Sequence, residues 1–384
     1  MLGPSISHPV YVIKDIATAG NGNGALYSCP LLTSVEFRGS YAAIPPKAAF
    51  LSYGIKALAF VTTANVSGIT AIPEKLCGQW GDQSSSPSPC QLTSLTLNGE
   101  PLLRNANILT VGGQIMAHCT LYSDFIDLPK CTTIGNFSFR NTGVPFANLM
   151  SVTSIGAGLF AQCASLERVV FGSEDQPTLA YDSKGGLFQS AFGSATSPVV
   201  IWNAKTAPAS LPENGFSASS NYKFTNYVRK EATGWSSLTS GVKQNFVSMD
   251  TVFTVHLRLD GETVITTLMP GVSGENSVWT IPASWFLGAG KTFGEGAVKN
   301  ASEVAIDGAT ALPDGTGLNL TITLPSSLVQ SVAGTTQDIE VFVDMVAQES
   351  QDPQITVSIV DASDNAVVEN SFSVTWIKEH FFMG

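Results

Sequence analysis

Charge is scarce in this sequence of 384 residues, and so are the residue patterns on which enzymes depend. Charged residues make up 13 %, and there are only four histidines: His8, His118, His256 and His380. None of them stands in an arrangement with an acid or thiol that forms a recognisable catalytic motif, and the chain contains neither a Gly-x-Ser-x-Gly elbow nor a His-Glu-x-x-His motif. We therefore expect a protein that is not an enzyme.

Long apolar runs and a cationic surface are also lacking. No run approaches the length of a membrane span. Residues 1–16 are interrupted by polar residues and prolines, so they form no recognisable signal peptide. The net charge of −11 argues against nucleic acid or an anionic membrane as a partner, because both require a cationic footprint.

Glycine, proline and short apolar segments are abundant instead. Hydrophobic residues make up 44 %, and 35 glycines and 20 prolines separate them, which indicates many turns and mainly β structure. Residues 1–245 carry a net charge of +2, whereas residues 246–384 carry −13. This shift predicts a domain boundary near residue 245.

All six cysteines lie before that boundary: Cys29, Cys77, Cys90, Cys119, Cys131 and Cys163. Six are too few for a disulfide scaffold, and no Cys-x-x-Cys pair suggests zinc. We interpret them as small buried core residues. One or two disulfides stay open as an alternative, with Cys77 and Cys90 as the first candidate pair. The sequence implies no metal and no cofactor.

A repeat within residues 131–171 predicts the architecture of the first domain. Residues 133–139 (Thr-Ile-Gly-Asn-Phe-Ser-Phe) are echoed by residues 154–160 (Ser-Ile-Gly-Ala-Gly-Leu-Phe), an offset of 21 residues. The alternating segment that follows Cys163 has relatives after Cys29 and after Cys90. Such a period is typical of a leucine-rich solenoid, in which each coil buries its apolar face only against its neighbours.

The rest of the first domain fits this solenoid with less regular coils. Residues 1–25 contain one apolar run, Val10–Ile13, which we interpret as a capping strand. Residues 44–50 and 72–77 are predicted to be degenerate coils, and residues 78–89 a polar loop. The solenoid is therefore expected to extend over residues 26–245.

These motifs resemble the leucine-rich repeats of BspA-like bacterial surface antigens. The resemblance rests on the Cys-x-x-Leu-x-x-Val-x-Phe and Thr-x-Ile-Gly-x-x-x-Phe phrases and covers roughly residues 26–245. Residues 198–202, 206–208 and 227–237 resemble the closing coil of such arrays, in which a strand, a turn with proline, a second strand and a short helix precede Gly-Trp. Arg229 stands where the family often has proline. The resemblance implies attachment to a partner on a cell surface.

The second domain, residues 246–384, is expected to be an acidic antiparallel β-sandwich, either immunoglobulin-like or a jelly roll. Its clearest signal is a hairpin formed by residues 251–259 and 262–268 around the Asp260-Gly261 turn. Five further strands are predicted at residues 278–281, 318–324, 339–346, 355–360 and 371–377.

Two possible ligand motifs in this domain are weak. Residues 288–292 (Gly-Ala-Gly-Lys-Thr) end like a phosphate-binding loop but lack its first glycine, so we predict a turn. A calcium site using Asp338, Glu340 and Asp344, or Asp361 and Asp364, stays open, but no loop spacing supports it.

We predict a non-enzymatic recognition or adhesion protein that presents its solenoid to a protein or glycan ligand. The setting would be extracellular, on a bacterial envelope or on a phage particle as a tail, fibre or decoration component. The alternatives are a purely structural assembly subunit, homo-oligomeric through the sandwich, and a polysaccharide-active enzyme. Candidate ligand-binding residues are Asn136, Arg140, Asn141, Glu167 and Arg168, together with Trp279 and Trp285, which are either core residues or a platform for a sugar ring.

Overall fold

The computed structural model shows a mainly β protein, as the sequence predicts. It describes residues 32–44, 55–77, 90–180, 186–195, 197–209, 224–235, 245–259, 262–272, 275–280, 318–324, 339–346, 355–361 and 372–378. In these ranges the regular elements are β-strands and two short 3-10 helices, η1 (Val66–Gly68) and η2 (Leu102–Arg104).

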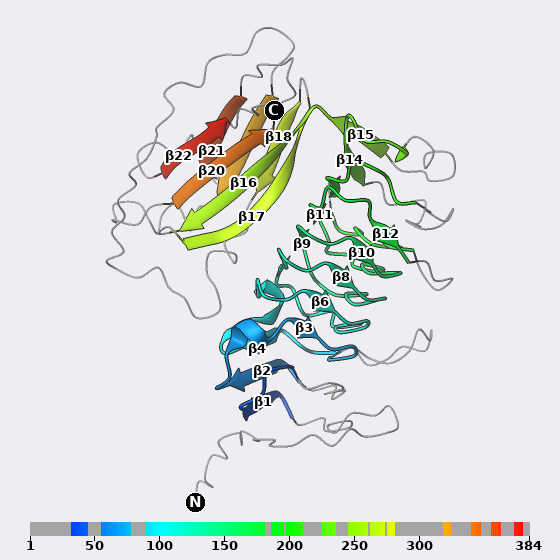
Figure 1. The fold of residues 1–384 in the computed structure, drawn as a ribbon, viewed down its shortest axis with the longest axis vertical. Helices are drawn as coiled ribbons and strands as arrows, with labels where there is room; N and C mark the ends of the chain where they lie inside the picture. The colour runs from blue at the N-terminus through cyan, green and yellow to red at the C-terminus, as the bar shows by residue number, and fades with distance from the viewer. Residues whose placement is uncertain are drawn as a thin grey trace, which may run out of the picture.

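The first part of the chain is a β-solenoid of stacked parallel coils (Figure 1). At the N-terminal end, three parallel strands form a first sheet with β5 (Glu100–Pro101) added antiparallel to the last of them: β1 (Ser34–Gly39), β2 (Ala57–Thr62) and β4 (Ser94–Leu97). From β6 to β13 the chain passes alternately through two further parallel sheets, one made of two-residue strands and one made mostly of longer strands.

We call these two sheets the short-strand sheet and the long-strand sheet. The short-strand sheet consists of β3 (Ala71–Ile72), β6 (Thr110–Val111), β8 (Thr133–Ile134), β10 (Ser154–Ile155) and β12 (Thr178–Leu179). The long-strand sheet consists of β7 (Ile126–Asp127), β9 (Phe146–Leu149), β11 (Arg168–Phe171), β13 (Val199–Trp202), β14 (Thr225–Arg229) and β15 (Asn245–Met249).

The repeat seen in the sequence is a stack of equivalent positions in the structure. Ile134 pairs in register with Ile155, and both are buried in the core. The phenylalanines that end the two repeat copies also stack: the ring centroids of Phe139 and Phe160 are 5.7 Å apart, and Phe188 of the next coil continues the row at 6.1 Å from Phe160. Each coil thus buries its apolar residues against equivalent residues of its neighbours.

The glycine after each repeated isoleucine allows neighbouring coils to approach closely. A Cβ added to Gly156 would lie 2.2 Å from the carbonyl carbon of Gly135, and one added to Gly135 would lie 2.4 Å from the amide nitrogen of Gly113. Backbone atoms of the preceding coil already occupy the space of a side chain at these positions. The glycines therefore set the spacing of the coils on this side of the solenoid.

The cysteines of the described chain are core residues, as predicted. Cys77, Cys90, Cys119, Cys131 and Cys163 are all buried and free. The alternative Cys77–Cys90 disulfide is not formed in this structure. Cys29, the capping run Val10–Ile13 and the polar loop 78–89 lie outside the described residues.

At the end of the solenoid, the strands and the buried aromatic residues expected of the closing coil are present, but the short helix is not. Trp235 is buried, with its ring 5.4 Å from that of Trp202 and 5.7 Å from that of Phe246. The predicted short helix before Gly234 is absent, because residues 230–233 form a turn and a single bridge to Thr206. β15 then extends the long-strand sheet, so the change to the C-terminal strands falls at Asp250.

The C-terminal strands form two sheets. One has the order β17-β16-β20-β22 and the other β18-β19-β21. Their bounds are β16 (Thr251–Leu259), β17 (Glu262–Gly271), β18 (Asn276–Thr280), β19 (Leu318–Leu324), β20 (Ile339–Val346), β21 (Ile355–Asp361) and β22 (Phe372–Lys378). The predicted hairpin is confirmed, since β16 and β17 pair antiparallel with Leu259 opposite Glu262.

The predicted antiparallel arrangement is wrong for three of the five strand pairs. β16 is antiparallel to β17 and to β20, but β20 with β22, β18 with β19, and β19 with β21 are parallel. For β20 with β22 and for β19 with β21, the reason is that β19, β20, β21 and β22 alternate between the two sheets along the chain, whereas β18 and β19 are consecutive described strands of one sheet. Two strands separated by a pass through the other sheet can run in the same direction, and alternation of apolar residues does not report strand direction.

Candidate ligand-binding surface

The coils that contain β6, β8 and β10 leave the short-strand sheet through a turn with two left-handed residues. These two residues lie three and seven positions after the buried second residue of the strand, which is Val111, Ile134 or Ile155. Their φ angles are between 54° and 66°, and the pairs are Gln114 and His118, Phe137 and Asn141, and Gly158 and Gln162. Backbone hydrogen bonds join the turns of successive coils, for example from His118 N–H to Arg140 O (2.8 Å) and from Asn141 N–H to Ala161 O (2.7 Å). We call the stacked turns 113–118, 136–141 and 157–162 the turn ridge.

Asn136 lies on the turn ridge and is exposed, as the sequence predicts for an outward residue. Its side-chain carbonyl accepts a hydrogen bond from the backbone N–H of Ala157 in the next coil at 2.8 Å. Asn136 therefore also joins two turns, and only its amide group is left to meet a ligand.

Two polar pairs connect the turns further along the ridge. Arg140 donates from Nε to Oε1 of Gln162 at 3.3 Å, and its guanidinium lies 5.5 Å from the ring centroid of Phe137. The amide nitrogen of Asn141 lies 3.0 Å from Nδ1 of His118. Burial, with a smaller contribution from the charge of Arg140, lowers the pKa of His118. The imidazole is therefore neutral near pH 7, and its Nδ1 accepts from Asn141.

These contacts bring Asn136, Arg140 and Asn141 together on one surface with two residues that the sequence did not single out, His118 and Gln162. The signal for them was present, because both hold the same repeat position as Asn141, 23 residues before it and 21 residues after it. The turn ridge offers amide, imidazole and guanidinium groups held by a stacked backbone. Such groups suit recognition of a polar ligand by hydrogen bonds.

Glu167 and Arg168 lie elsewhere, at the start of β11. Glu167 is exposed, whereas Arg168 is half-buried and donates from Nη2 to the backbone carbonyl of Val278 in β18 at 3.2 Å. Burial lowers the pKa of Arg168 to about 10, which leaves it charged at neutral pH. The contact shows that β18 reaches the start of β11 in the long-strand sheet, so the two residues do not share a surface with the turn ridge.

The C-terminal strands cover the outer face of the long-strand sheet. Val170 and Ile201 point away from the solenoid core yet are fully buried, and so is Asn148 of β9. Asn148 donates to the backbone carbonyl of Thr266 (2.7 Å) and accepts from Oγ1 of Thr267 (2.9 Å), both in β17. We call this contact between β9 and β17 the junction.

The junction includes an acidic side chain. Nδ2 of Asn148 also donates to Oδ1 of Asp127 in β7 at 2.8 Å. Burial raises the pKa of Asp127 to about 6, against the opposing effects of the Asn148 hydrogen bond and the charge of Arg104. No pattern in the sequence points to this site, because an asparagine inside a strand does not reveal a partner that lies 118 residues further along the chain.

Of the two predicted sugar-binding tryptophans, Trp279 is only 2 % exposed, in β18. Its ring is therefore packed inside the protein, which agrees with the alternative interpretation as a core residue. Trp285 and residues 288–292 lie outside the described residues.

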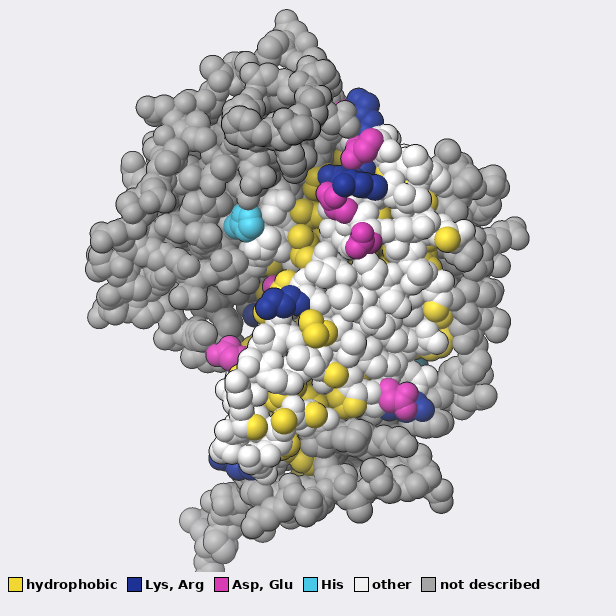
Figure 2. All heavy atoms as spheres, viewed as in Figure 1, with side chains coloured by type: hydrophobic (Ala, Val, Ile, Leu, Met, Phe, Trp, Pro, Cys, Tyr) yellow, Lys and Arg dark blue, Asp and Glu magenta, His cyan; other side chains and the backbone are white. Residues whose placement is uncertain are grey.

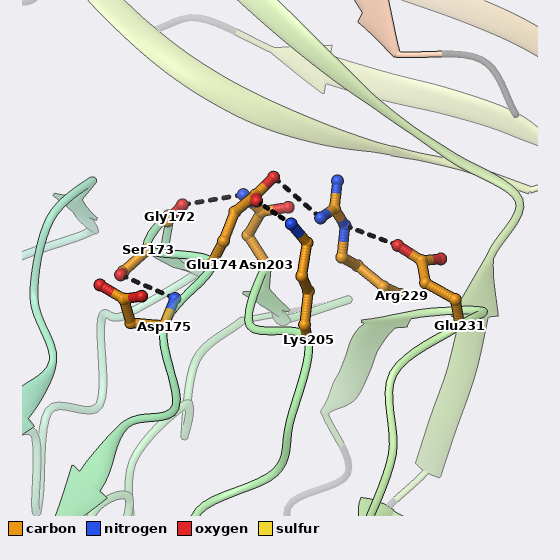
Figure 3. A network of polar contacts seen from close by, with 8 residues as sticks. All are labelled: Gly172, Ser173, Glu174, Asp175, Asn203, Lys205, Arg229 and Glu231. Carbon is orange, nitrogen blue, oxygen red and sulfur yellow. Dashed lines mark hydrogen bonds and ion pairs between the residues drawn. The ribbon is translucent and has the colours of Figure 1, made fainter. Parts of the chain in front are cut away.

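A cluster of charged residues lies at the C-terminal end of the solenoid (Figure 3). Glu174 accepts from Lys205 Nζ (2.5 Å) and from Arg229 Nη1 (2.9 Å), and Arg229 also pairs with Glu231 through Nε (3.2 Å). The hydrogen bond from Lys205 is the first cause that lowers the pKa of Glu174. A carboxyl group held ionised in this way is poorly suited to act as a general acid. Figure 2 shows acidic and basic side chains beside one another at this end of the solenoid.

In the part of the chain that the structure describes, no group of three or more His, Cys, Asp or Glu side chains is arranged to hold a metal ion. The helices described there include none that is long and apolar enough to span a membrane. The fold and the turn ridge define a β-solenoid protein with a polar turn surface and one covered sheet. No family model matches the chain, and neither a curated protein nor a solved structure matches it.

Proposed function

We propose that this chain is a non-enzymatic recognition or adhesion protein that binds a protein or glycan ligand through the turn ridge. The observation that carries the proposal is the alignment of His118, Arg140, Asn141 and Gln162 across successive coils, on turns held by backbone hydrogen bonds. A rigid scaffold that presents polar side chains loses little conformational entropy on binding.

The finer assignment of the fold belongs to the same proposal. The stacked coils are those of an irregular leucine-rich-repeat solenoid of the BspA-like type, and the two C-terminal sheets pack as a β-sandwich that serves as an anchor or second contact module. The protein would act outside the cell, on a bacterial envelope or as a component of a phage particle. The repeats in the sequence and the in-register stacking of Ile134 on Ile155 support the first assignment.

The test is a binding screen of the full chain against bacterial surface polysaccharides and host matrix proteins. Any ligand found is measured again with Arg140→Ala and with Lys130→Ala, which removes one exposed positive charge away from the ridge. We expect Arg140→Ala to weaken binding about tenfold or more and Lys130→Ala to leave it unchanged. Absence of any ligand, or equal binding by both variants, would contradict the proposal.

A structural subunit of a larger assembly is the second candidate. In that role, exposed apolar side chains such as Leu109 (42 % exposed) and Leu121 (52 %) of one coil would pack against a neighbouring subunit. Mass measurement in solution separates the two candidates. A trimer or a co-purifying particle protein supports the structural role, and a stable monomer counts against it.

A further inference from the structure

Three cysteines of neighbouring coils converge in the N-terminal half of the solenoid core. Cys77, Cys90 and Cys119 are 3 %, 6 % and 0 % exposed. The sulfur of Cys119 lies 3.8 Å from the backbone carbonyl oxygen of Cys77, and the backbone N–H of Cys90 donates to the carbonyl of His118 at 3.2 Å.

The backbone places Cys90 directly beside Cys119. In the parallel strand pairs of this solenoid, a residue donates its N–H to the carbonyl of the residue just before its partner. Thr178, for example, is paired with Ser154 and donates to Thr153 O. By the same pattern, the bond from Cys90 to His118 O places Cys119 opposite Cys90. Paired residues of adjacent strands lie about 4.8 Å apart, inside the usual Cα–Cα range of disulfides, about 4.4 to 6.8 Å. Cys90 and Cys119 also both point into the core.

The thiols differ in how readily they ionise. The hydrogen bond from the Cys119 thiol is the first cause that lowers the pKa of Cys90, whereas burial raises the pKa of Cys119 and of Cys77 well above the ordinary value. Because the thiolate is the reactive form, Cys90 is the nucleophile of the group. It is also the most exposed of the three.

We propose that Cys90 and Cys119 form a disulfide between neighbouring coils when the protein meets a low-molecular-weight disulfide, while Cys77 stays a thiol. The Cys90 thiolate attacks one sulfur of the small disulfide, forms a mixed disulfide and releases the other half as a thiolate. The Cys119 thiol gives its proton to that thiolate and attacks Cys90 Sγ, expelling the second half. The two protein sulfurs are oxidised, and the small disulfide is reduced to a thiol and a thiolate.

The bond would fasten the N-terminal coils once the protein leaves a reducing compartment. Closing the loop between residues 90 and 119 removes conformations from the unfolded chain, so the oxidised protein should unfold at a higher temperature. The oxidising setting rests on the proposed extracellular function, because small disulfides accumulate outside the reducing cytosol. The pairing itself rests only on the geometry.

The experiment treats the folded, reduced full chain with oxidised glutathione and maps its disulfides after alkylation. Digestion with trypsin and chymotrypsin separates the three cysteines, since Trp80 lies between Cys77 and Cys90 and Arg104 between Cys90 and Cys119. We expect a Cys90–Cys119 peptide, also in Cys77→Ser, and none in Cys90→Ser or Cys119→Ser. The unfolding temperature should rise by several degrees and fall again with dithiothreitol.

A Cys77–Cys90 or Cys77–Cys119 peptide, a mixed disulfide on Cys90 alone, or three unreacted thiols would each overturn the proposal. The wild-type map decides even if a serine variant fails to fold. No ligand is involved in this measurement, so its failure is distinct from failure of the proposed recognition function.

Discussion

At the scale of single residues, the glycine stack is the least tolerant feature of the solenoid. Gly156→Ala would place a methyl group 2.2 Å from a backbone carbon of Gly135, where no flexible side chain can move aside. We expect the free energy of unfolding to fall by about 3 kcal/mol or more, because the two coils must separate. Urea unfolding of the full chain measures this loss.

Gly68→Ala is the matched control for that substitution. Gly68 lies in η1, and an added Cβ there meets no atom within 4 Å. Its free energy of unfolding should change by less than about 0.5 kcal/mol. Equal effects at Gly68 and Gly156 would mean that coil spacing is not set by the glycines.

Asp127 gives the junction a pH dependence of definite sign. Its pKa is raised from the ordinary 3.8 to about 6, so between these values the folded state binds more protons than the unfolded state. The stability that Asp127 contributes is complete below about pH 4 and is lost as the pH rises through 6. Thermal unfolding should therefore show Asp127→Asn to be more stable than the wild type at pH 7, by about 1–2 kcal/mol.

The same comparison at pH 4 should give a much smaller difference, since Asp127 is then protonated. The groups near Asp127 include Arg104, whose charge opposes the shift, and Asn148, whose amide donates to the carboxylate. His256 of β16 bonds Thr266, the residue whose carbonyl Asn148 contacts. If the variant and the wild type differed equally at pH 4 and pH 7, the buried Asp127 carboxyl would not be the cause.

At the scale of elements, the sequence predicts the repeated coils and the strands in which apolar and polar residues alternate. The Ile-Gly units were predictable as equivalent coils because each position faces its counterpart in the next coil, and β8 and β10 do pair in this way. The strands β19 and β20 were predicted at their observed bounds from alternation alone. Direction and partners of strands were not predictable, because they depend on connections between sheets that no local pattern records.

In the candidate site, too, the residues defined by a local pattern were predictable and those defined by long-range contacts were not. Asn136, Arg140 and Asn141 were predictable as outward residues of a turn, since the neighbouring positions are apolar core. The sequence could not show that Arg168 meets a backbone carbonyl of β18, because that contact joins residues 110 positions apart. Asn148 was missed for the same reason.

The stacked phenylalanines should dominate the stability of the central coils. Phe160 is fully buried between the rings of Phe139 and Phe188. Phe160→Ala should lower the free energy of unfolding by about 3–5 kcal/mol, because it removes contacts on both sides and leaves a cavity. Leu121→Ala, at a residue that is 52 % exposed, should cost less than about 0.5 kcal/mol in the same urea titration.

At the scale of the whole molecule, the junction couples the solenoid to the C-terminal strands. We expect a double-mutant cycle of Asn148→Ala and Thr267→Val to give a coupling energy of about 0.5–3 kcal/mol, since the two side chains share a buried hydrogen bond. Asn148→Ala combined with Thr133→Val, at an exposed threonine of the short-strand sheet, should be additive. A coupling energy near zero in the first pair would mean that the junction does not join the two parts energetically.

The junction also has a consequence for synthesis on the ribosome. Coils of the solenoid involve neighbours along the chain and can form as they emerge, because local contacts close quickly. Asn148, however, finds its partners in β17 only 118 and 119 residues later. Until that strand appears, the outer face of the long-strand sheet, with Val170 and Ile201, stays open to water. The nascent protein therefore exposes an apolar face from the synthesis of Val170 until β17 (Glu262–Gly271) follows, and during that interval a chaperone could protect it from aggregation.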